Sequence, residues 1–139
     1  MSILVVCCKK NEPPEYEPWP IEESFIYYSD KLPEEFVPAD TRPKYVETEE
    51  EYQKILKNWG VDTMPFEFDP NESSLITVVS WLDYPIEDVE MKVWYGKERV
   101  MFWRRYHYQN SELEEEYYEL IMVKLPKLPA QLPIFFIVE

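Results

Sequence analysis

Glycine, cysteine and histidine are scarce in this chain: two glycines, two cysteines and one histidine among 139 residues. With only Gly60 and Gly96, the glycine-rich loops that cradle phosphates are excluded. Cys7 and Cys8 are adjacent, so they cannot close a long disulfide loop and do not indicate an oxidising compartment. His107 has no second histidine with which to build a zinc site, and it is predicted to be a solvated strand residue.

Basic residues and long apolar runs are also scarce. Fourteen Lys and Arg stand against 28 Asp and Glu, which gives a net charge of −14. Such a chain lacks the basic footprint that binds nucleic-acid phosphates or an anionic membrane surface. No apolar run approaches the ~18–20 residues of a membrane-spanning helix. We therefore expect the partner to be another protein, with no nucleic acid and no cofactor involved.

Aromatic residues and prolines, in contrast, are abundant: seven Phe, five Trp, eleven Tyr and thirteen Pro. Hydrophobic residues form 45% of the chain, enough for a core at this single-domain length. Large rings suit strands, where they pack across neighbours. These features predict one β-rich globular domain over residues 21–139. Residues 1–20 are expected to be an N-terminal tether or edge strand followed by a Pro/Glu-rich linker.

One helix is clearly predicted. Thr48 as N-cap and Glu51 three residues later form a capping box, and Gly60 follows as a left-handed stop. Between them runs one apolar stripe at helical spacing, formed by Tyr52, Ile55, Leu56 and Trp59. So short a helix does not hold alone, and it needs a sheet to lie on.

Strands are predicted by alternating or continuous apolar patterns over residues 25–28, 75–81, 89–95, 100–108, 117–123 and 134–138. The run at 75–81 is expected to be central and the last one buried, while a short loop at Gly96 joins a hairpin. Residues 124–133, with frequent prolines, are expected to be extended and polyproline-like. The fold class is α+β and mostly β: an antiparallel sheet or sandwich with one short capped helix packed on it.

The apolar run at Ser2–Val6 ends in Cys7-Cys8 and turns polar at once. Three interpretations stay open: a buried strand, the end of a secretory signal, or a frayed cytosolic terminus. Residues 4–11 resemble the lipobox and first mature residues of small Gram-negative surface lipoproteins. The resemblance implies that Cys7 or Cys8 carries a lipid, which would be the only membrane contact, and that the protein lies in the cell envelope. Without an upstream signal it would be cytoplasmic.

The element order from Tyr45 to Val138 carries a second resemblance. The chain begins this region with a strand and a capped helix that ends in Trp59. A Phe-Glu-Phe-Asp-Pro segment, an apolar strand and a polar hairpin follow, and a Lys-Leu-Pro segment leads into the last strand. This order resembles the domain of protease-complex-subunit-like envelope lipoproteins, although Asp83-Tyr84-Pro85 stands where that family has a glycine-rich turn. The family has no catalytic residues to carry over, so the resemblance implies a protein-binding domain associated with a protease or another enzyme.

No catalytic or metal-binding constellation is predicted. The glutamate runs at 49–51 and 114–116 are typical of solvent-facing charge, whereas a glycosidase needs two carboxylates facing each other across a cleft. The segment from Asp69 copies the first three ligand positions of a calcium loop but lacks its later glycine and glutamate. We therefore expect a non-enzyme; two carboxylates within reach in one pocket would favour a hydrolase instead.

The hairpin at 89–108 carries the candidate contact surface, because arginines and large rings interleave there and such residues carry interface energy. Pairing of the arginines with Glu87, Asp88 or Glu90 within the sheet is the structural alternative. The predicted binding residues are Trp94, Arg99, Trp103, Arg104, Arg105 and Tyr106.

Two functions follow from these patterns. The first is a non-enzymatic, protein-binding envelope lipoprotein domain that uses the hairpin surface. The second is a cytosolic acidic interaction protein, such as a DNA mimic or an immunity-type or anti-host-defence inhibitor, which the net charge and the glutamate runs favour.

Overall fold

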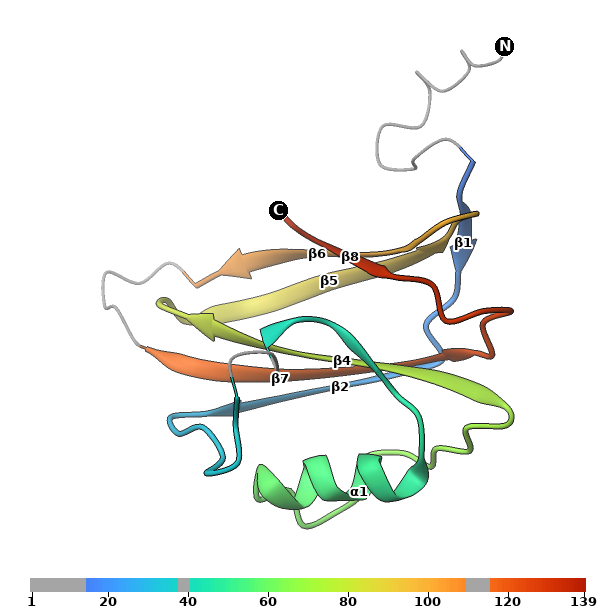
Figure 1. Cartoon of the computed structure of the whole chain (residues 1–139). Helices are drawn as coiled ribbons and strands as arrows, with labels where there is room; N and C mark the ends of the chain where they lie inside the picture. Colours follow the sequence, from blue (N-terminus) through green and yellow to red (C-terminus); the bar gives the residue numbers. More distant parts are fainter. Residues whose placement is uncertain (1–14, 38–40, 110–115) are drawn as a thin grey trace.

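The computed structural model describes residues 15–37, 41–109 and 116–139 and is built from two packed β-sheets and one helix (Figure 1). Sheet A has the strand order β1-β5-β6-β8, and sheet B has the order β2-β7-β4-β3. The elements are β1 (Glu17–Trp19), β2 (Glu23–Ser29), β3 (Lys44–Val46), α1 (Glu49–Asn58), β4 (Ser73–Leu82), β5 (Ile86–Tyr95), β6 (Val100–Tyr108), β7 (Tyr117–Pro126) and β8 (Ile134–Val138).

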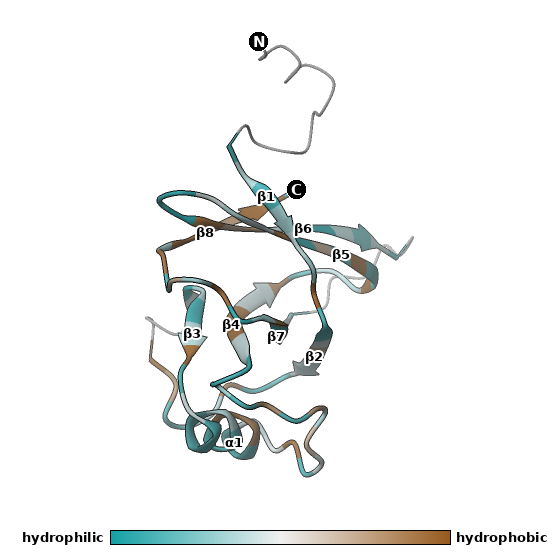
Figure 2. Cartoon of the chain, turned by 90° about the vertical axis from the view of Figure 1, so that its right-hand side faces the viewer, coloured by the Kyte–Doolittle hydropathy of each residue, from teal (hydrophilic) through white to brown (hydrophobic). Residues whose placement is uncertain are grey.

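Sheet A, sheet B and α1 form three successive layers, as the view turned by 90° shows (Figure 2). Sheet B is the middle layer, so both of its faces are covered. This arrangement confirms the predicted mostly-β sandwich with one short helix packed on it.

Two hydrophobic cores fill the spaces between the layers. Because side chains alternate along a strand, β4 sends Ile76 and Val78 toward sheet A and Leu75 and Val79 toward α1. The core between the sheets is formed by Ile76, Val78, Val93, Val100, Phe102, Ile121, Val123, Leu125 and Leu128. The core under the helix is formed by Val46, Tyr52, Leu56, Trp59, Phe66, Phe68, Leu75, Val79, Leu120 and Met122.

The helix begins and ends as predicted. Thr48 Oγ1 accepts the Glu51 N–H at 3.0 Å, and Glu51 Oε1 in turn accepts the N–H of Glu47, one residue before the N-cap, at 2.9 Å. Gly60 has a φ of 78°, the left-handed conformation that ends the helix. Fully buried Tyr52 donates its hydroxyl to the Phe66 carbonyl at 2.7 Å, and its burial raises the tyrosine pKa to about 12.

Several strand predictions are confirmed in existence but wrong in extent or pairing. Residues 17–19 of the predicted linker form β1, an edge strand on β5 that tolerates Pro18 because its other side needs no ladder hydrogen bond. The first residues of the predicted polyproline segment, up to Pro126, continue β7 against β4. The last strand, β8, pairs in parallel with β6 and lies at a sheet edge, so it is not buried: Phe135 is 48% exposed.

The apolar segment at the N-terminus, with Cys7 and Cys8, and the first two residues of the glutamate run at 114–116 lie outside the described residues. Within the described residues, no helix has the length and apolar character that crossing a membrane requires.

Replacing the N-cap tests the local origin of the helix. Thr48→Ala removes the acceptor for the Glu51 N–H, and we expect it to lower the free energy of unfolding by about 1 kcal/mol. Urea denaturation measures this change. Gln53→Ala, which removes only an exposed side-chain contact to Glu49, is the control and should change stability by less than about 0.5 kcal/mol. Equal effects of the two substitutions would contradict the capping role.

Candidate functional site

The predicted contact surface is divided between the two faces of sheet A. Trp94, Trp103 and Arg105 lie on the outer face, away from sheet B, whereas Arg104 and Tyr106 point inward. Arg104 is 4% exposed and Tyr106 is 7% exposed. Neither of these two is therefore a surface residue, and their prediction as partner-contacting residues was wrong. Successive residues of one strand cannot share a face, so the arginine pair at 104–105 had to split.

Arg104 belongs to a polar cluster enclosed between the sheets. Its guanidinium donates from Nη1 to Glu119 Oε1 and from Nη2 to Ser80 Oγ, each at 2.7 Å. Tyr106 donates its hydroxyl to the same Glu119 oxygen. Arg104 Cζ lies 4.6 Å from the ring centre of Tyr106 and 4.3 Å from that of Phe136. We call Arg104, Glu119, Tyr106 and Ser80 the inter-sheet cluster.

Strand register explains why this cluster forms. On sheet B, Glu119 of β7 stands directly between its register partners Tyr28 of β2 and Ser80 of β4. Cross-strand neighbours share a face, so these three polar side chains face sheet A in one row. On sheet A, Arg104 and Tyr106 are two residues apart on β6 and meet that row.

Burial dominates the electrostatics of the cluster. Loss of solvent raises the pKa of Glu119, while the hydrogen bond from Tyr106 and the charge of Arg104 act in the opposite direction. Burial and the neighbouring Glu119 carboxylate raise the pKa values of Tyr106 and Tyr28 above the ordinary tyrosine range. Both hydroxyls therefore stay protonated at neutral pH. Arg104 Nε and Glu119 Oε2 are buried without a hydrogen-bond partner among the described residues, so the cluster is only partly satisfied within itself.

The outer face of sheet A keeps the remaining predicted residues together. Lys92 Nζ lies 5.3 Å and the Arg105 guanidinium 5.5 Å from the ring centre of Trp103, and the Arg99 guanidinium lies 4.2 Å from that of Phe135. Trp94 and Trp103 are only 3% and 5% exposed, as little as Arg104 and Tyr106, so these two rings are not surface residues either and their prediction as partner-contacting residues was also wrong. The exposed side chains of this face are Lys92, Arg105 and Phe135. The cations thus stand over rings that are themselves packed, and we call Lys92, Trp94, Arg99, Trp103, Arg105 and Phe135 the outer face.

The structural alternative for this hairpin is also present in part. Glu90 Oε2 lies 3.7 Å from Arg105 Nη1 and 3.5 Å from His107 Nε2. These side chains are 41–48% exposed, so the pairs are worth little in stability. His107 is thus a solvated strand residue beside a carboxylate, and no group of metal-ligating side chains occurs in the described part of the chain.

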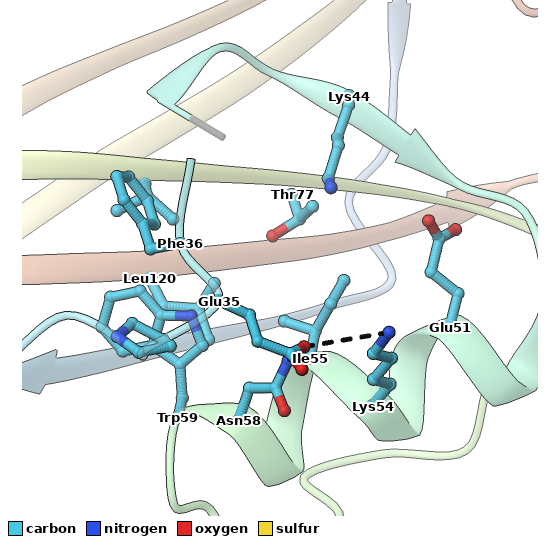
Figure 3. A pocket seen from close by; sticks show the side chains of 12 residues that line it. Glu35, Phe36, Lys44, Glu51, Lys54, Ile55, Asn58, Trp59, Thr77 and Leu120 are labelled. Atoms are coloured by element: carbon cyan, nitrogen blue, oxygen red, sulfur yellow. Dashed lines mark hydrogen bonds and ion pairs between the residues drawn. The ribbon is translucent and has the colours of Figure 1, made fainter. Parts of the chain in front are cut away.

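A cavity of about 210 Å³ opens between α1, the Pro33–Phe36 segment and sheet B (Figure 3). Ile55, Trp59 and Leu120 are among its apolar lining residues, and charged side chains surround them. Several of these polar groups interact with each other. The Glu35 carboxylate lies 3.9 Å from Lys54 Nζ and accepts a hydrogen bond from the Asn58 side-chain amide at 3.4 Å. Thr77 donates to the Ile121 carbonyl at 3.0 Å. The cavity is therefore a seam between helix and sheet.

Comparison of the chain with models of protein families, with curated proteins and with solved structures gives no match.

Breaking the inter-sheet cluster on one side should be costly. Arg104→Met leaves the Glu119 charge buried without its cation, and we expect a loss of about 3–5 kcal/mol in the free energy of unfolding at neutral pH. Removing both partners in Arg104→Met/Glu119→Leu should recover more than half of that loss, because no buried charge remains. Urea denaturation of both variants measures the coupling, and a double variant no better than the single one would contradict it.

The single variant should also depend on pH in a defined direction. Without Arg104, the pKa of Glu119 in the folded protein rises further above its unfolded value, so the native state binds an additional proton. The loss in free energy of unfolding that Arg104→Met causes should therefore be small at pH values below the carboxyl pKa of the unfolded chain. It should grow as the pH rises through the pKa of Glu119 in the folded protein. Denaturation midpoints from acid to neutral pH, compared with wild type at each pH, test this sign.

Proposed function

We propose that this chain is a non-enzymatic protein-binding domain whose contact surface is the outer face. The observation that supports the proposal is the gathering of Lys92, Arg99 and Arg105 over packed rings in a chain whose net charge is −14. Arginine and aromatic side chains are the residues that contribute most to binding energy at protein interfaces.

The geometry of the outer face favours binding because its parts are held in place before a partner arrives. Trp103 is packed and donates its indole N–H to the Glu139 carboxylate, and it contacts both Lys92 and Arg105. Side chains that are already ordered lose less conformational entropy on association. At the edge of the same sheet, β8 adds the half-exposed ring of Phe135. The matching partner surface is apolar with acidic groups around it.

The resemblance of residues 45–138 to protease-complex-subunit-like lipoproteins suggests the kind of partner and the compartment. We propose that the partner is a protease or another enzyme, and that the domain is held in the cell envelope by a lipid on Cys7 or Cys8. A cytosolic acidic inhibitor is the alternative, and it would engage a basic partner through its carboxylates instead.

Site-directed photo-crosslinking tests the outer face. With p-benzoylphenylalanine in place of Phe135, we expect one discrete adduct in an extract of the native host, whereas the same probe at Gln53 on α1 should give none. Arg105→Glu should weaken capture at position 135 by at least about fivefold, which corresponds to roughly 1 kcal/mol.

The control for net charge is Lys54→Glu, which reverses an exposed cation on α1 and should leave capture unchanged. Identical adducts from both probe positions, or equal effects of the two charge reversals, would remove the outer face from consideration. If moderate salt abolished crosslinking at position 135 equally in Arg105→Glu and Lys54→Glu, the result would instead favour the acidic-inhibitor alternative.

The compartment can be tested separately. If the gene is expressed with its own upstream segment and an alkyne-labelled fatty acid, we expect label in the protein and its loss in Cys7→Ser or Cys8→Ser. Unlabelled wild-type protein in the cytoplasmic fraction would contradict the lipoprotein proposal.

A further inference from the structure

A second surface, at the end of the sandwich, has the opposite character to the outer face. There the end of β2, the start of β5 and the start of β7 enclose an open cleft of about 340 Å³. Tyr28, Tyr117, Pro85 and Ile86 are its main apolar lining residues, and Asp30 and Glu116 are its charged ones. We call it the tyrosine cleft. We infer that it binds an arginine side chain presented by a basic segment of a partner protein, independently of the outer face.

Rings are concentrated at this end of the molecule. Tyr28 and Tyr117 meet edge to face at 5.4 Å and 77°, and Tyr84 and Tyr108 do so at 6.3 Å and 85°. The two pairs are linked, because the Tyr117 hydroxyl donates to the Tyr84 carbonyl at 2.7 Å. Of these four rings, Tyr28 and Tyr117 line the cleft, and Tyr28 is 44% exposed, so part of its ring can meet a ligand.

The cleft is held in shape by the structure beneath and beside it. Gln109 donates its backbone N–H to the Pro85 carbonyl at 3.0 Å and its side-chain amide to the Ile86 carbonyl at 3.3 Å. Tyr28 stands next to Glu119 in register, at the margin of the inter-sheet cluster. A cleft that is formed before binding needs little ordering when the ligand enters.

Charge decides which ligand fits. Two carboxylates and no cation are found among the described lining residues. The nearby Arg104 is enclosed and already bound to Glu119, and no cation of the described residues lies over the ring of Tyr28 or Tyr108. On the outer face, by contrast, Trp103 and Phe135 already have cations from this chain.

An arginine satisfies both features of the cleft at once. Its planar guanidinium stacks on an aromatic face, while its N–H groups donate to carboxylates in the same plane. Exposed cation–π contacts are worth roughly 0.5–1 kcal/mol each, which corresponds to about a two- to fivefold change in affinity. One such contact with Tyr28 together with two carboxylates favours an arginine over a neutral side chain of equal size.

Calorimetric titration of the full chain tests the inference with a capped Gly-Arg-Gly-Arg-Gly peptide and its citrulline counterpart. Citrulline keeps the shape of arginine but lacks the charge. We expect saturable binding of the arginine peptide and at least tenfold weaker binding of the citrulline peptide. Asp30→Asn and Glu116→Gln should each weaken binding of the arginine peptide about fivefold, and Tyr28→Leu, which removes a ring that lines the cleft, should weaken it about two- to fivefold.

Matched controls separate the cleft from the general acidity of the chain. Glu50→Gln and Asp62→Asn remove the same charge at exposed positions elsewhere and should change the affinity less than twofold. Tyr28→Phe keeps the ring, and its affinity for the arginine peptide should lie within twofold of that of wild type. This conservative variant gives a readout that does not depend on a larger change at the cleft. Equal affinity for the two peptides, equal effects of all four charge removals, or undiminished binding by Tyr28→Leu would overturn the inference.

Discussion

The central strands of sheet B are covered on both faces, and the rest of the molecule is arranged around that constraint. β4 and β7 lie between sheet A on one side and α1 on the other. A strand in that position must be apolar at nearly every residue, and β7 is buried from Glu119 to Val123. Buried Thr77 finds its partner within sheet B, but the charged side chain of Glu119 has its partners on the opposing sheet. Arg104 and Tyr106 are those partners.

The sequence predicts the elements that depend on local patterns. The cap at Thr48, the stop at Gly60 and the run at 75–81 each have a short-range physical cause, and the structure confirms all three. The hairpin around Gly96 is also local, and it is confirmed with Gly96 N–H donating to the Arg99 carbonyl.

The features that could not be predicted depend on contacts far apart in the chain. Alternation separates Arg104 from Arg105, but large rings occupy both faces of β6, so the pattern alone does not say which face is inner. The pairing of Arg104 with Glu119 depends on how two sheets stack. The parallel pairing of β8 with β6 depends on the crossover through residues 127–133, which no local propensity encodes. The tyrosine cleft likewise gathers residues from four separate segments.

The order of the strands along the chain has a consequence for synthesis. β4 emerges from the ribosome well before its main partner β7, because the whole β5–β6 hairpin lies between them. At 5–20 residues per second, an unpaired strand with six apolar residues among its ten is exposed for a time on the order of seconds. The nascent protein thus passes through a stage in which the apolar side chains of β4 must be protected from aggregation, by a chaperone or by early packing on the preceding helix α1.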